Sequence, residues 1–550
     1  MNAPLPVPAI WTTRSTAEIK TGTWRAMLPR HIHAPSPCHD ACPVGGDIAA
    51  WIGQARARDW RGAWETLVRH NPFPAIAGRI CHHPCESACN RAGFDQSLAI
   101  CKLERFVGDT ALAQRWPLPR AEAPRGRSVA VVGGGPAGLS AAYQLRRRGY
   151  RVTLIEAQAE LGGLMRYGIP PYRLAREVLD GEIDRIVDMG IELRCGEAPV
   201  GAVELARLRA DHDAVYLATG ARRPKRLRQL DYDGVRVRDG AAYLSRSAAG
   251  EAPGRGQRVR VGGGGSAAFD VARSARRKGH EVTVLALEPH DRLPAQREEV
   301  TEAMEEGVRV LDGAMLRGAR AGAAGALRID GVRVHFEAGT VRGDFTTRPI
   351  DGSDFGLDAD AIISAIGQDP DLAPWRDALA CQGELLATDA DGATSADDVW
   401  AGGDLTSMAR FVTEAVGMGE RAALAIHRRL QATSADAPPA EDTVGLGAIA
   451  LHYHPQGARA AERTLDLPLR RTGQAEVQLG LDVEAALAEA ARCFSCGTCT
   501  HCDNCVNYCP DMAVQRAGDG YIVLTDYCKG CGVCVKECPT GSMKMLEELR

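Results

Sequence analysis

The 550-residue chain is 45% hydrophobic, which indicates a globular protein long enough for several domains with their own cores. Its 66 Lys and Arg against 70 Asp and Glu leave a net charge of -4, which argues against nucleic acid as a partner. We find neither an apolar run of about 18 residues nor a signal peptide, so we expect a cytoplasmic protein without a membrane span, whose 18 cysteines stay reduced and bind metal.

The first predicted unit is a helical segment with two groups of cysteines. Residues 1–30 carry no pattern, and we expect them to form an extended arm. The two groups, separated by helical stretches, are Cys38 with Cys42, and Cys81 with Cys85 and Cys89. This order of motifs resembles the N-terminal iron-sulfur domain of the glutamate synthase small subunit and of dihydropyrimidine dehydrogenase, which implies [4Fe-4S] clusters.

The second group has the spacing i, i+4, i+8 and needs a fourth ligand. Two candidates, Cys101 and Glu104, follow it on one expected helix face. Thiolate chemistry favours Cys101. The resemblance to dihydropyrimidine dehydrogenase, which has an oxygen ligand at the aligned position, favours Glu104. We lean to Glu104 and keep both.

A dinucleotide-binding fingerprint begins at residue 128. A buried strand leads into Gly-x-Gly-x-x-Gly and a helix, and a second strand ends on an acid about twenty residues later. Glycines in such a turn let the backbone approach a pyrophosphate at the helix N-terminus, and the acid accepts a ribose hydroxyl. The expected FAD contacts here are Gly133, Gly135, Pro136, Ala137, Gly138 and Glu156.

Downstream motifs extend the flavin prediction. The run from Leu161 to Pro170 closely resembles the flavin domain of the glutamate synthase small subunit. The Gly402-Gly403-Asp404 turn resembles the one whose aspartate holds the ribityl and pyrophosphate end of FAD, and a nicotinamide fold without flavin would have no use for it. The further expected contacts are Gly162, Gly163, Arg166, Thr219, Gly220, Gly403 and Asp404.

A second dinucleotide fold is inserted within the first. A strand at 258–261 leads to Gly-x-Gly-x-x-Ala, in which alanine still permits close packing of helix on strand. This nesting resembles flavoproteins with two dinucleotide-binding domains, and the chain returns to the flavin fold at 361–368. The expected nicotinamide contacts are Gly263, Gly265, Ser266, Ala268, Glu288 and Gly367.

Glu288 predicts NADH rather than NADPH. NADPH-using members of the resembled family carry two arginines where this chain has Leu287 and Glu288. Arginine binds a 2′-phosphate, whereas glutamate repels it and accepts a ribose hydroxyl. Arg292 is close enough in sequence to replace the missing arginines, so that alternative stays open.

The segment after residue 492 carries ten of the 18 cysteines. Two tandem Cys-x2-Cys-x2-Cys-x3-Cys-Pro runs indicate two [4Fe-4S] clusters, with the fourth cysteine of each run ligating the other cluster. Zinc ribbons and disulfide scaffolds do not use this doubled run. The segment resembles a bacterial two-cluster ferredoxin. The expected ligand sets are Cys499, Cys502, Cys505 and Cys538, and Cys509, Cys528, Cys531 and Cys534.

The resembled family has a Cys-x2-Cys pair ahead of the motif that contains Cys38 and Cys42, and nothing upstream of Cys38 provides it here. Cys493 and Cys496, which follow Arg492 and precede the ferredoxin motif, resemble that missing pair. We therefore predict a cluster of Cys38, Cys42, Cys493 and Cys496 that staples the C-terminal module to the N-terminal domain, which brings the total to about four clusters. In the alternative, Cys493 and Cys496 are spare thiols and the first cluster is lost.

The predicted fold class is α/β, with nested Rossmann-like domains between a helical iron-sulfur domain and a ferredoxin-like 2[4Fe-4S] domain. The expected boundaries are 31–118 for the helical domain, 127–250 with 395–430 for the FAD-binding domain, 251–394 for the NAD(P)-binding domain, 431–492 for a linker and 493–550 for the ferredoxin domain.

These motifs predict an NAD(P)H oxidoreductase in electron transport, in which the cofactors carry the chemistry and no catalytic side chain is needed. The expected partners are NADH and either ferredoxin or a larger catalytic subunit, such as a 2-oxoacid:ferredoxin oxidoreductase, in a hetero-oligomer. One alternative is a glutamate synthase small subunit, against which the ferredoxin segment and Glu288 count. Another is a non-catalytic scaffold or redox sensor, which two intact nucleotide folds disfavour.

Overall fold

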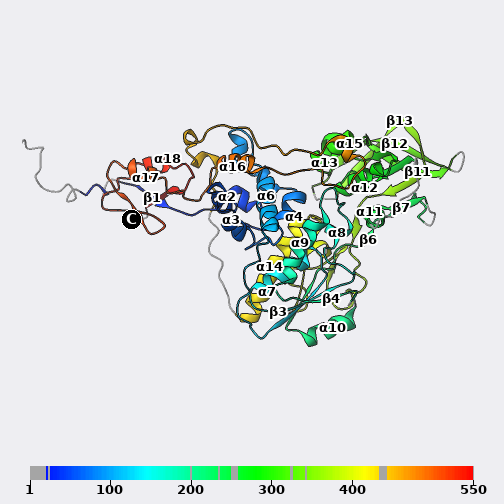
Figure 1. Cartoon of the computed structure of the whole chain (residues 1–550), viewed down its shortest axis with the longest axis horizontal. Helices are drawn as coiled ribbons and strands as arrows, with labels where there is room; N and C mark the ends of the chain where they lie inside the picture. Colours follow the sequence, from blue (N-terminus) through cyan, green and yellow to red (C-terminus); the bar gives the residue numbers. More distant parts are fainter. Residues whose placement is uncertain are drawn as a thin grey trace, which may run out of the picture.

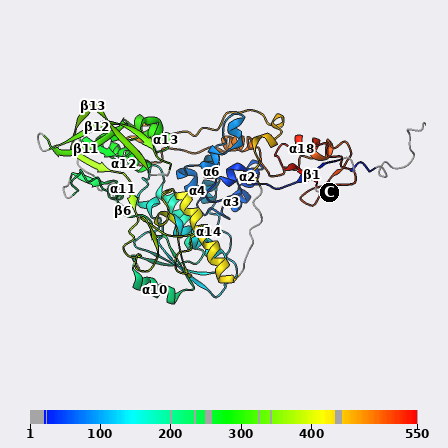
Figure 2. The same ribbon diagram turned by 180° about the vertical axis from the view of Figure 1, so that it is seen from behind.

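The computed structural model describes residues 20–22, 25–198, 201–232, 236–248, 258–322, 326–340, 344–432 and 442–548. Most of the arm expected at 1–30 and the start of the linker expected at 431–492 therefore lie outside the described residues. The molecule is elongated, with the ferredoxin module at one end, the nicotinamide fold at the other and the helical domain between them (Figure 1). The view from behind shows the same order, with the flavin fold below the helical domain (Figure 2).

The helical domain is built from short helices around buried tryptophans. Ser36 and Asp59 cap two of these helices by accepting backbone N–H groups, and Trp51 and Trp64 are almost fully buried. The elements are α1 (Pro37–Asp40), α2 (Ile48–Arg56), α3 (Trp60–Leu67), α4 (Pro74–Ile80), α5 (Pro84–Ser87), η3 (Asn90–Gly93) and α6 (Ile100–Ala113).

The flavin fold is a five-stranded parallel sheet in the order β18-β5-β2-β3-β4. Its edge strand β18 follows the whole nicotinamide fold in sequence, which confirms the predicted nesting. The strands are β2 (Ser128–Val132), β3 (Arg151–Glu156), β4 (Glu192–Cys195), β5 (Ala214–Leu217) and β18 (Val399–Ala401). The helices are α7 (Pro136–Arg147), α8 (Leu164–Tyr167), α9 (Arg176–Val187), α10 (Ala202–Asp211) and α14 (Val412–Gln431), with η6 at Gly403–Leu405.

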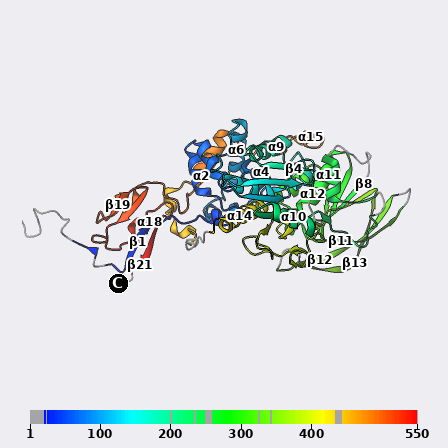
Figure 3. The same ribbon diagram turned by 90° about the horizontal axis from the view of Figure 1, so that it is seen from below.

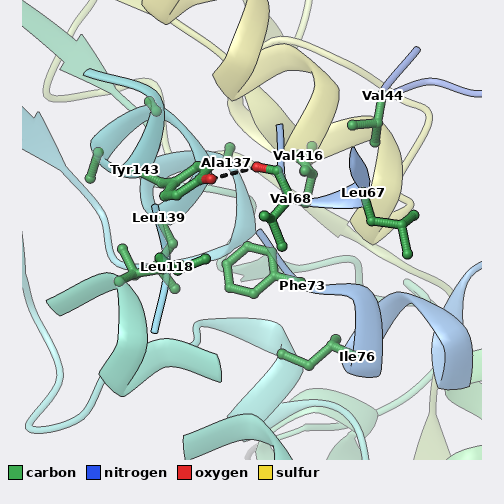
Figure 4. Close-up of a cluster of buried hydrophobic side chains, with 14 of the residues drawn as sticks. Val44, Leu67, Val68, Phe73, Ile76, Leu118, Ala137, Leu139, Tyr143 and Val416 are labelled. Carbon is green, nitrogen blue, oxygen red and sulfur yellow. Dashed lines mark hydrogen bonds between the residues drawn. The ribbon is translucent and has the colours of Figure 1, made fainter. Parts of the chain in front are cut away.

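The helical domain and the flavin fold share one hydrophobic core. Val68 and Phe73 of the helical domain lie beside Leu139 and Tyr143 of α7 (Figure 4), and all four side chains are buried. The Tyr143 hydroxyl donates a hydrogen bond to the Val68 carbonyl across this contact. The first cluster-binding segment is therefore packed directly on the flavin fold.

The nicotinamide fold is a second parallel sheet, in the order β10-β9-β8-β14-β7, beside an antiparallel sheet of β11, β12 and β13. Its strands are β7 (Val237–Asp239), β8 (Arg258–Gly262), β9 (Glu281–Leu285), β10 (Arg309–Leu311), β11 (Ala314–Ala321), β12 (Leu327–Ala338), β13 (Phe345–Ala359) and β14 (Ala361–Ser364). Its helices are α11 (Gly240–Ala248), α12 (Ser266–Arg277), η4 (His290–Arg292) and α13 (Arg297–Glu305). Short pairs join β6 (Arg223–Pro224) to β15 (Gln368–Asp369) and β16 (Cys381–Gln382) to β17 (Leu385–Leu386).

The ferredoxin module contains an N-terminal strand that the sequence analysis missed. Residues 27–31, expected within an extended arm, form β1 (Met27–His31), which pairs antiparallel with β21 (Met543–Glu547). Figure 3 shows this N-terminal strand beside the red C-terminal one. The module also holds α17 (Asn504–Asn507), α18 (Val533–Lys536) and the hairpin of β19 (Val514–Ala517) and β20 (Gly520–Val523).

The segment 442–492, called the strap below, runs from the ferredoxin module across the helical domain to the nicotinamide fold. We expected a linker here, but its carboxylates bind buried arginines. Glu476 accepts hydrogen bonds from Arg79 at 2.6 Å and from Arg105 at 3.0 Å, and Arg470 pairs with Glu305 of α13 at 2.7 Å. The strap contains η7 (Leu446–Ala448), η8 (Leu451–Tyr453), α15 (Leu467–Arg470) and α16 (Val483–Ala491).

Among the described residues, no helix has the length and apolar character needed to cross a bilayer.

Candidate cofactor sites

The flavin fingerprint forms a tight turn between β2 and α7. Gly133 has a φ of +110°, which side chains rarely adopt, and a Cβ on Gly138 would lie 1.8 Å from the Gly133 oxygen. Only glycine therefore lets the helix approach the strand so closely. A Cβ on Gly220 after β5 would meet nothing within 4 Å, so the space beside this residue is open.

Glu156 ends β3 with a fixed and buried carboxylate. Its Oε2 accepts the Gly134 amide at 2.7 Å, and its Oε1 accepts the Gln158 amide at 2.8 Å. The carboxylate is thus held against the glycine turn, where the fingerprint requires an acceptor for a ribose hydroxyl.

Two further loops meet the start of α7, where Pro136 is the first residue. A Cβ on Gly163 would lie 2.8 Å from the Gly135 Cα, and a Cβ on Gly403 would lie 3.0 Å from the Ala137 Cβ. The predicted residues Gly162, Gly163, Gly403 and Asp404 are therefore brought to the fingerprint although the last two are far away in sequence. Such close backbone contacts need glycine and leave a narrow cradle that suits a pyrophosphate.

Two predicted charged contacts already have protein partners. The Arg166 guanidinium donates to the Leu161 carbonyl at 2.6 Å and pairs with Asp180. Burial raises the pKa of the Asp404 carboxyl, and Arg410 lies 3.8 Å from it. Thr219 stands between β5 and Gly220 at the same edge of the sheet.

The nicotinamide turn repeats this construction. Gly263 has a φ of +135°, and a Cβ on it would lie 2.4 Å from the Ala365 oxygen. Ser266 begins α12, and Ala268 in the first turn of this helix is fully buried. A Cβ on Gly265 would meet nothing within 4 Å. Gly367 follows β14 with a φ of +100°.

Glu288 occupies in this fold the place that Glu156 has in the flavin fold. A Cβ on Gly264 would lie 2.5 Å from the Glu288 Oε2, just as one on Gly134 would lie 3.2 Å from the Glu156 Oε2. Burial raises the pKa of the Glu288 carboxyl. Arg292, the competing candidate, is exposed in η4.

The ferredoxin cysteines line two cavities. One, the outer cavity, is lined by Cys509, Cys528, Cys531 and Cys534, and the other, the inner cavity, by Cys499, Cys502, Cys505 and Cys538. These are the two crossed ligand sets expected from the sequence. No three His, Cys, Asp or Glu side chains in the described ranges converge on a single-ion site. Thiols around a cavity suit a cubane, whose ligands bind separate irons.

The N-terminal cysteines group differently from the sequence-based prediction. Cys38 interacts electrostatically with Cys89, Cys493 and Cys496, whereas Cys42 has Glu104, Cys81 and Cys85 as its charged neighbours. The prediction had joined Cys42 to Cys38 and Cys89 to Cys81. The structure therefore corrects it by exchanging Cys42 and Cys89.

The exchange follows from where the helices end. We had grouped Cys81, Cys85 and Cys89 by their spacing, but α5 spans only Pro84–Ser87, and Cys89 follows it with an extended backbone at φ -65° and ψ 123°. Asn90 then donates to the Cys496 Sγ at 3.4 Å, which ties this turn to the C-terminal pair.

Two glycines bring Cys81 close to Glu104. A Cβ on Gly78 of α4 would lie 2.3 Å from the Arg105 nitrogen, and one on Gly108 of α6 would lie 2.3 Å from the Ala75 nitrogen. The two helices therefore touch backbone to backbone. Cys81 ends α4, and Glu104 projects from α6.

Both candidates for the fourth donor lie near these thiols. Cys42, Cys81 and Cys85 have Glu104 as a charged neighbour. Cys101 is a neighbour of Cys81 and Cys85 too, but its thiol donates to the Ala77 carbonyl at 3.5 Å. Burial raises the pKa of Glu104 to about 7. An iron bound to the oxygen of such a buried carboxyl would compensate the charge of the carboxylate.

The thiols themselves need a strong cation. Burial raises the pKa of the Cys81, Cys496, Cys505 and Cys534 thiols to about 12 and that of Cys493 to about 11. At such pKa values the free thiols are protonated at neutral pH, and a metal that binds them as thiolates displaces the protons. The donor set therefore fits iron-sulfur clusters.

Sequence reasoning missed the contacts that link these sites. Thr413, at the start of α14 in the flavin fold, lies 3.5 Å from the Cys81 Sγ through its hydroxyl, and Phe411 stacks on His82 at 3.7 Å. At the other end, the Gly497 amide donates to the Thr540 carbonyl at 2.7 Å. No sequence pattern marks these contacts, because each joins segments that are far apart in the sequence.

Three family models match the chain. One described as pyridine nucleotide-disulphide oxidoreductase matches residues 127–419, and one described as dihydropyrimidine dehydrogenase domain II, 4Fe-4S cluster, matches residues 31–116. A third, a 4Fe-4S binding domain, matches residues 521–544. These matches support FAD, a pyridine nucleotide and 4Fe-4S clusters as cofactors.

Relatives carry the same combination. The chain is 33% identical over 507 residues to the NADP(+)-dependent formate dehydrogenase subunit beta of Moorella thermoacetica, covering 84% of this chain and 70% of that one. It is 32% identical over 399 residues to the NAD-dependent dihydropyrimidine dehydrogenase subunit PreT of Escherichia coli, covering 72% and 91%. It is 33% identical over 444 residues to the glutamate synthase [NADPH] small chain of Mycobacterium tuberculosis, covering 74% and 88%. It spans 64% of another relative at 33% identity. The predicted resemblance is confirmed.

Proposed function

Given that the chain belongs to the pyridine nucleotide-disulphide oxidoreductase family and is an NAD(P)H oxidoreductase with FAD and iron-sulfur domains, we propose that it is the electron-transfer subunit of a larger complex. In this role it moves electrons between NADH and a low-potential partner, which is ferredoxin or a catalytic subunit such as a 2-oxoacid:ferredoxin oxidoreductase. FAD supplies the exchange between hydride and single electrons, and clusters carry single electrons. We place it in the cytosol, where thiols stay reduced.

One observation supports this proposal: contacts between the cysteine groups lead from the flavin fold to the ferredoxin module. Cys81 touches α14 of the flavin fold through Thr413, and Cys38 shares a turn of chain with Cys42. Gly497 then contacts Thr540 of the ferredoxin module. We propose the ligand sets Cys42, Cys81, Cys85 and Glu104, then Cys38, Cys89, Cys493 and Cys496, then the inner and the outer cavity.

The preference for NADH rests on Glu288. Its carboxylate stands at the fingerprint turn as Glu156 does, where it accepts ribose hydroxyls and repels a 2′-phosphate. We expect Glu288→Ala to lower kcat/KM for NADH by about tenfold or more, because a hydrogen bond to a charged group is worth about 1.5–3 kcal/mol. NADPH should lose nothing.

The experiment measures flavin bleaching by NADH and by NADPH in the anaerobically reconstituted chain. Arg292→Ala is the matched variant. If Arg292 is what binds the nucleotide, this variant should selectively lose activity with NADPH, and a wild-type preference for NADPH would overturn the assignment to Glu288. Copurification from the native host, with mass identification, tests the partner, and glutamate formation with a large subunit would favour the role of glutamate synthase small chain that one relative suggests.

A further inference from the structure

The described N-terminal residues 20–22 and 25–31 lie along the ferredoxin module. The Gly22 amide donates to the Asp526 carbonyl at 2.9 Å, and β1 pairs with β21 over five residues from Met27↔Glu547 to His31↔Met543. Pro29 lines the outer cavity, and His31 lines the inner one. The N-terminal segment is therefore part of the walls of both cavities.

Arg25 is the one charge of this segment that is buried beside the outer cavity. Its side chain is 8% exposed, and its Nη1 donates to the Gly22 carbonyl at 2.8 Å and to the Cys528 carbonyl at 3.2 Å. The same nitrogen also bonds the Thr525 carbonyl, and Nη2 pairs with Glu548. A Cβ on Gly530 would lie 2.8 Å from the Arg25 Cβ, so the arginine is packed against the ligand loop itself.

The outer cavity is also the last of the proposed sites. The inner cavity is tied to the rest of the chain, because the Cys538 carbonyl accepts the Ala450 amide at 3.0 Å and Thr540 accepts Gly497. The outer cavity contacts the N-terminal segment instead, and its ligand Cys531 is exposed. The module forms one tip of the elongated molecule (Figure 3).

We propose that Arg25 is a positioning residue that sets the reduction potential of the cluster in the outer cavity. The inference rests on the proposed ligand set of Cys509, Cys528, Cys531 and Cys534. Reduction adds one negative charge to the cluster at this site. A nearby buried cation favours the reduced cluster, because solvent screens a buried charge poorly. Glu548 moderates this effect from the other side of the guanidinium. The N-terminal segment thus adjusts the step at which electrons leave for, or arrive from, the partner.

The test compares four variants of the full chain, reconstituted with iron and sulfide under anaerobic conditions. Potentiometric titration followed by electron paramagnetic resonance gives the potential of each cluster, and Cys531→Ser identifies the signal of the outer one. Arg25→Gln should lower the ratio of reduced to oxidised outer cluster about tenfold at a fixed potential, which is about 59 mV for one electron. Glu548→Gln should raise that ratio.

Lys20→Gln is the matched control, because it removes an exposed cation of the same segment that pairs with Asp526 at 2.9 Å. It should leave the potential unchanged, since solvent screens exposed pairs. If the pair of Arg25 and Glu548 only holds the chain in place, the two variants should shift the potential in the same direction or not at all. Either result overturns the proposal.

Iron analysis separates this proposal from the proposed function. If the wild-type module holds no clusters, the ligand assignment fails. Full iron content without opposite shifts removes only the role of Arg25. If Arg25→Gln loses its iron, Glu548→Gln alone decides. Removing the Glu548 charge should then raise the potential of the outer cluster, and a potential that stays level or falls contradicts the role of Arg25.

Discussion

The crossing of α4 and α6 gives the sharpest test of how the helical domain holds its iron. Gly108→Ala adds a Cβ that would lie 2.3 Å from the Ala75 nitrogen and 2.6 Å from its Cα. Both are backbone atoms that no rotamer change can move. Ordinary contact begins near 3.4 Å, so the helices must separate by about 1 Å.

That separation acts on the cluster more than on the fold. Overpacking costs about 1–3 kcal/mol, and the better helix propensity of alanine returns about 1 kcal/mol. The displacement, however, moves Cys81 away from Glu104 by more than the roughly 0.5 Å within which a site must be held. We expect the chain to fold and to lose one cluster, so that iron falls from about 16 to about 12 per chain.

The assay is iron and acid-labile sulfide per polypeptide after anaerobic reconstitution, with flavin content as the check on folding. Gly53→Ala in α2 is the matched control, because a Cβ there would meet nothing within 4 Å. It should keep all iron and gain up to about 1 kcal/mol of stability. Equal iron in Gly108→Ala and the wild type would refute the view that this crossing positions the ligands.

Two further changes probe the links between domains. Thr413→Val keeps the shape of the side chain but removes the hydroxyl 3.5 Å from the Cys81 Sγ. At a fixed potential, the ratio of reduced to oxidised cluster at this site should fall several-fold, with the iron content unchanged. Identical potentiometric titrations of the variant and the wild type would contradict this. Glu476→Gln removes the charged acceptor that the buried Arg79 and Arg105 share, which should cost about 1.5–3 kcal/mol in urea unfolding, because hydrogen bonds to a charged group are worth that much and both guanidinium groups keep Asp109 as a partner. The same change at exposed Glu484 should cost almost nothing, and equal midpoints for both variants would speak against a structural role of the strap.

The sequence predicted best where the ligands are local. The two cavities of the ferredoxin module are lined by the cysteines that the doubled motif assigned to them, because each set is fixed by one tight loop and one crossing residue. Prediction was wrong for the grouping of Cys42 and Cys89. Their partners come from segments far apart, and α5 ends at Ser87, so the backbone leaves the helix before Cys89.

The N-terminal strand could not be predicted for a different reason. Residues 27–31 include Pro29 and show no alternation, and the partner strand lies more than five hundred residues later. An edge strand of this kind is specified by its neighbour rather than by its own pattern. The glycine fingerprints needed no such partner, since strand, turn and acid all lie within one supersecondary unit.

The strap joins the helical domain to the flavin fold. Glu476 accepts the Ala175 amide of the flavin fold at 3.1 Å while it binds Arg79 and Arg105 of the helical domain. One carboxylate therefore belongs to both folds at once. Separating them would leave two buried guanidinium groups without this acceptor, at a cost that single surface ion pairs do not reach. Because Cys81 lies on the helical side and Thr413 on the flavin side of the same boundary, the charge network fixes the distance between the flavin site and the first cluster site.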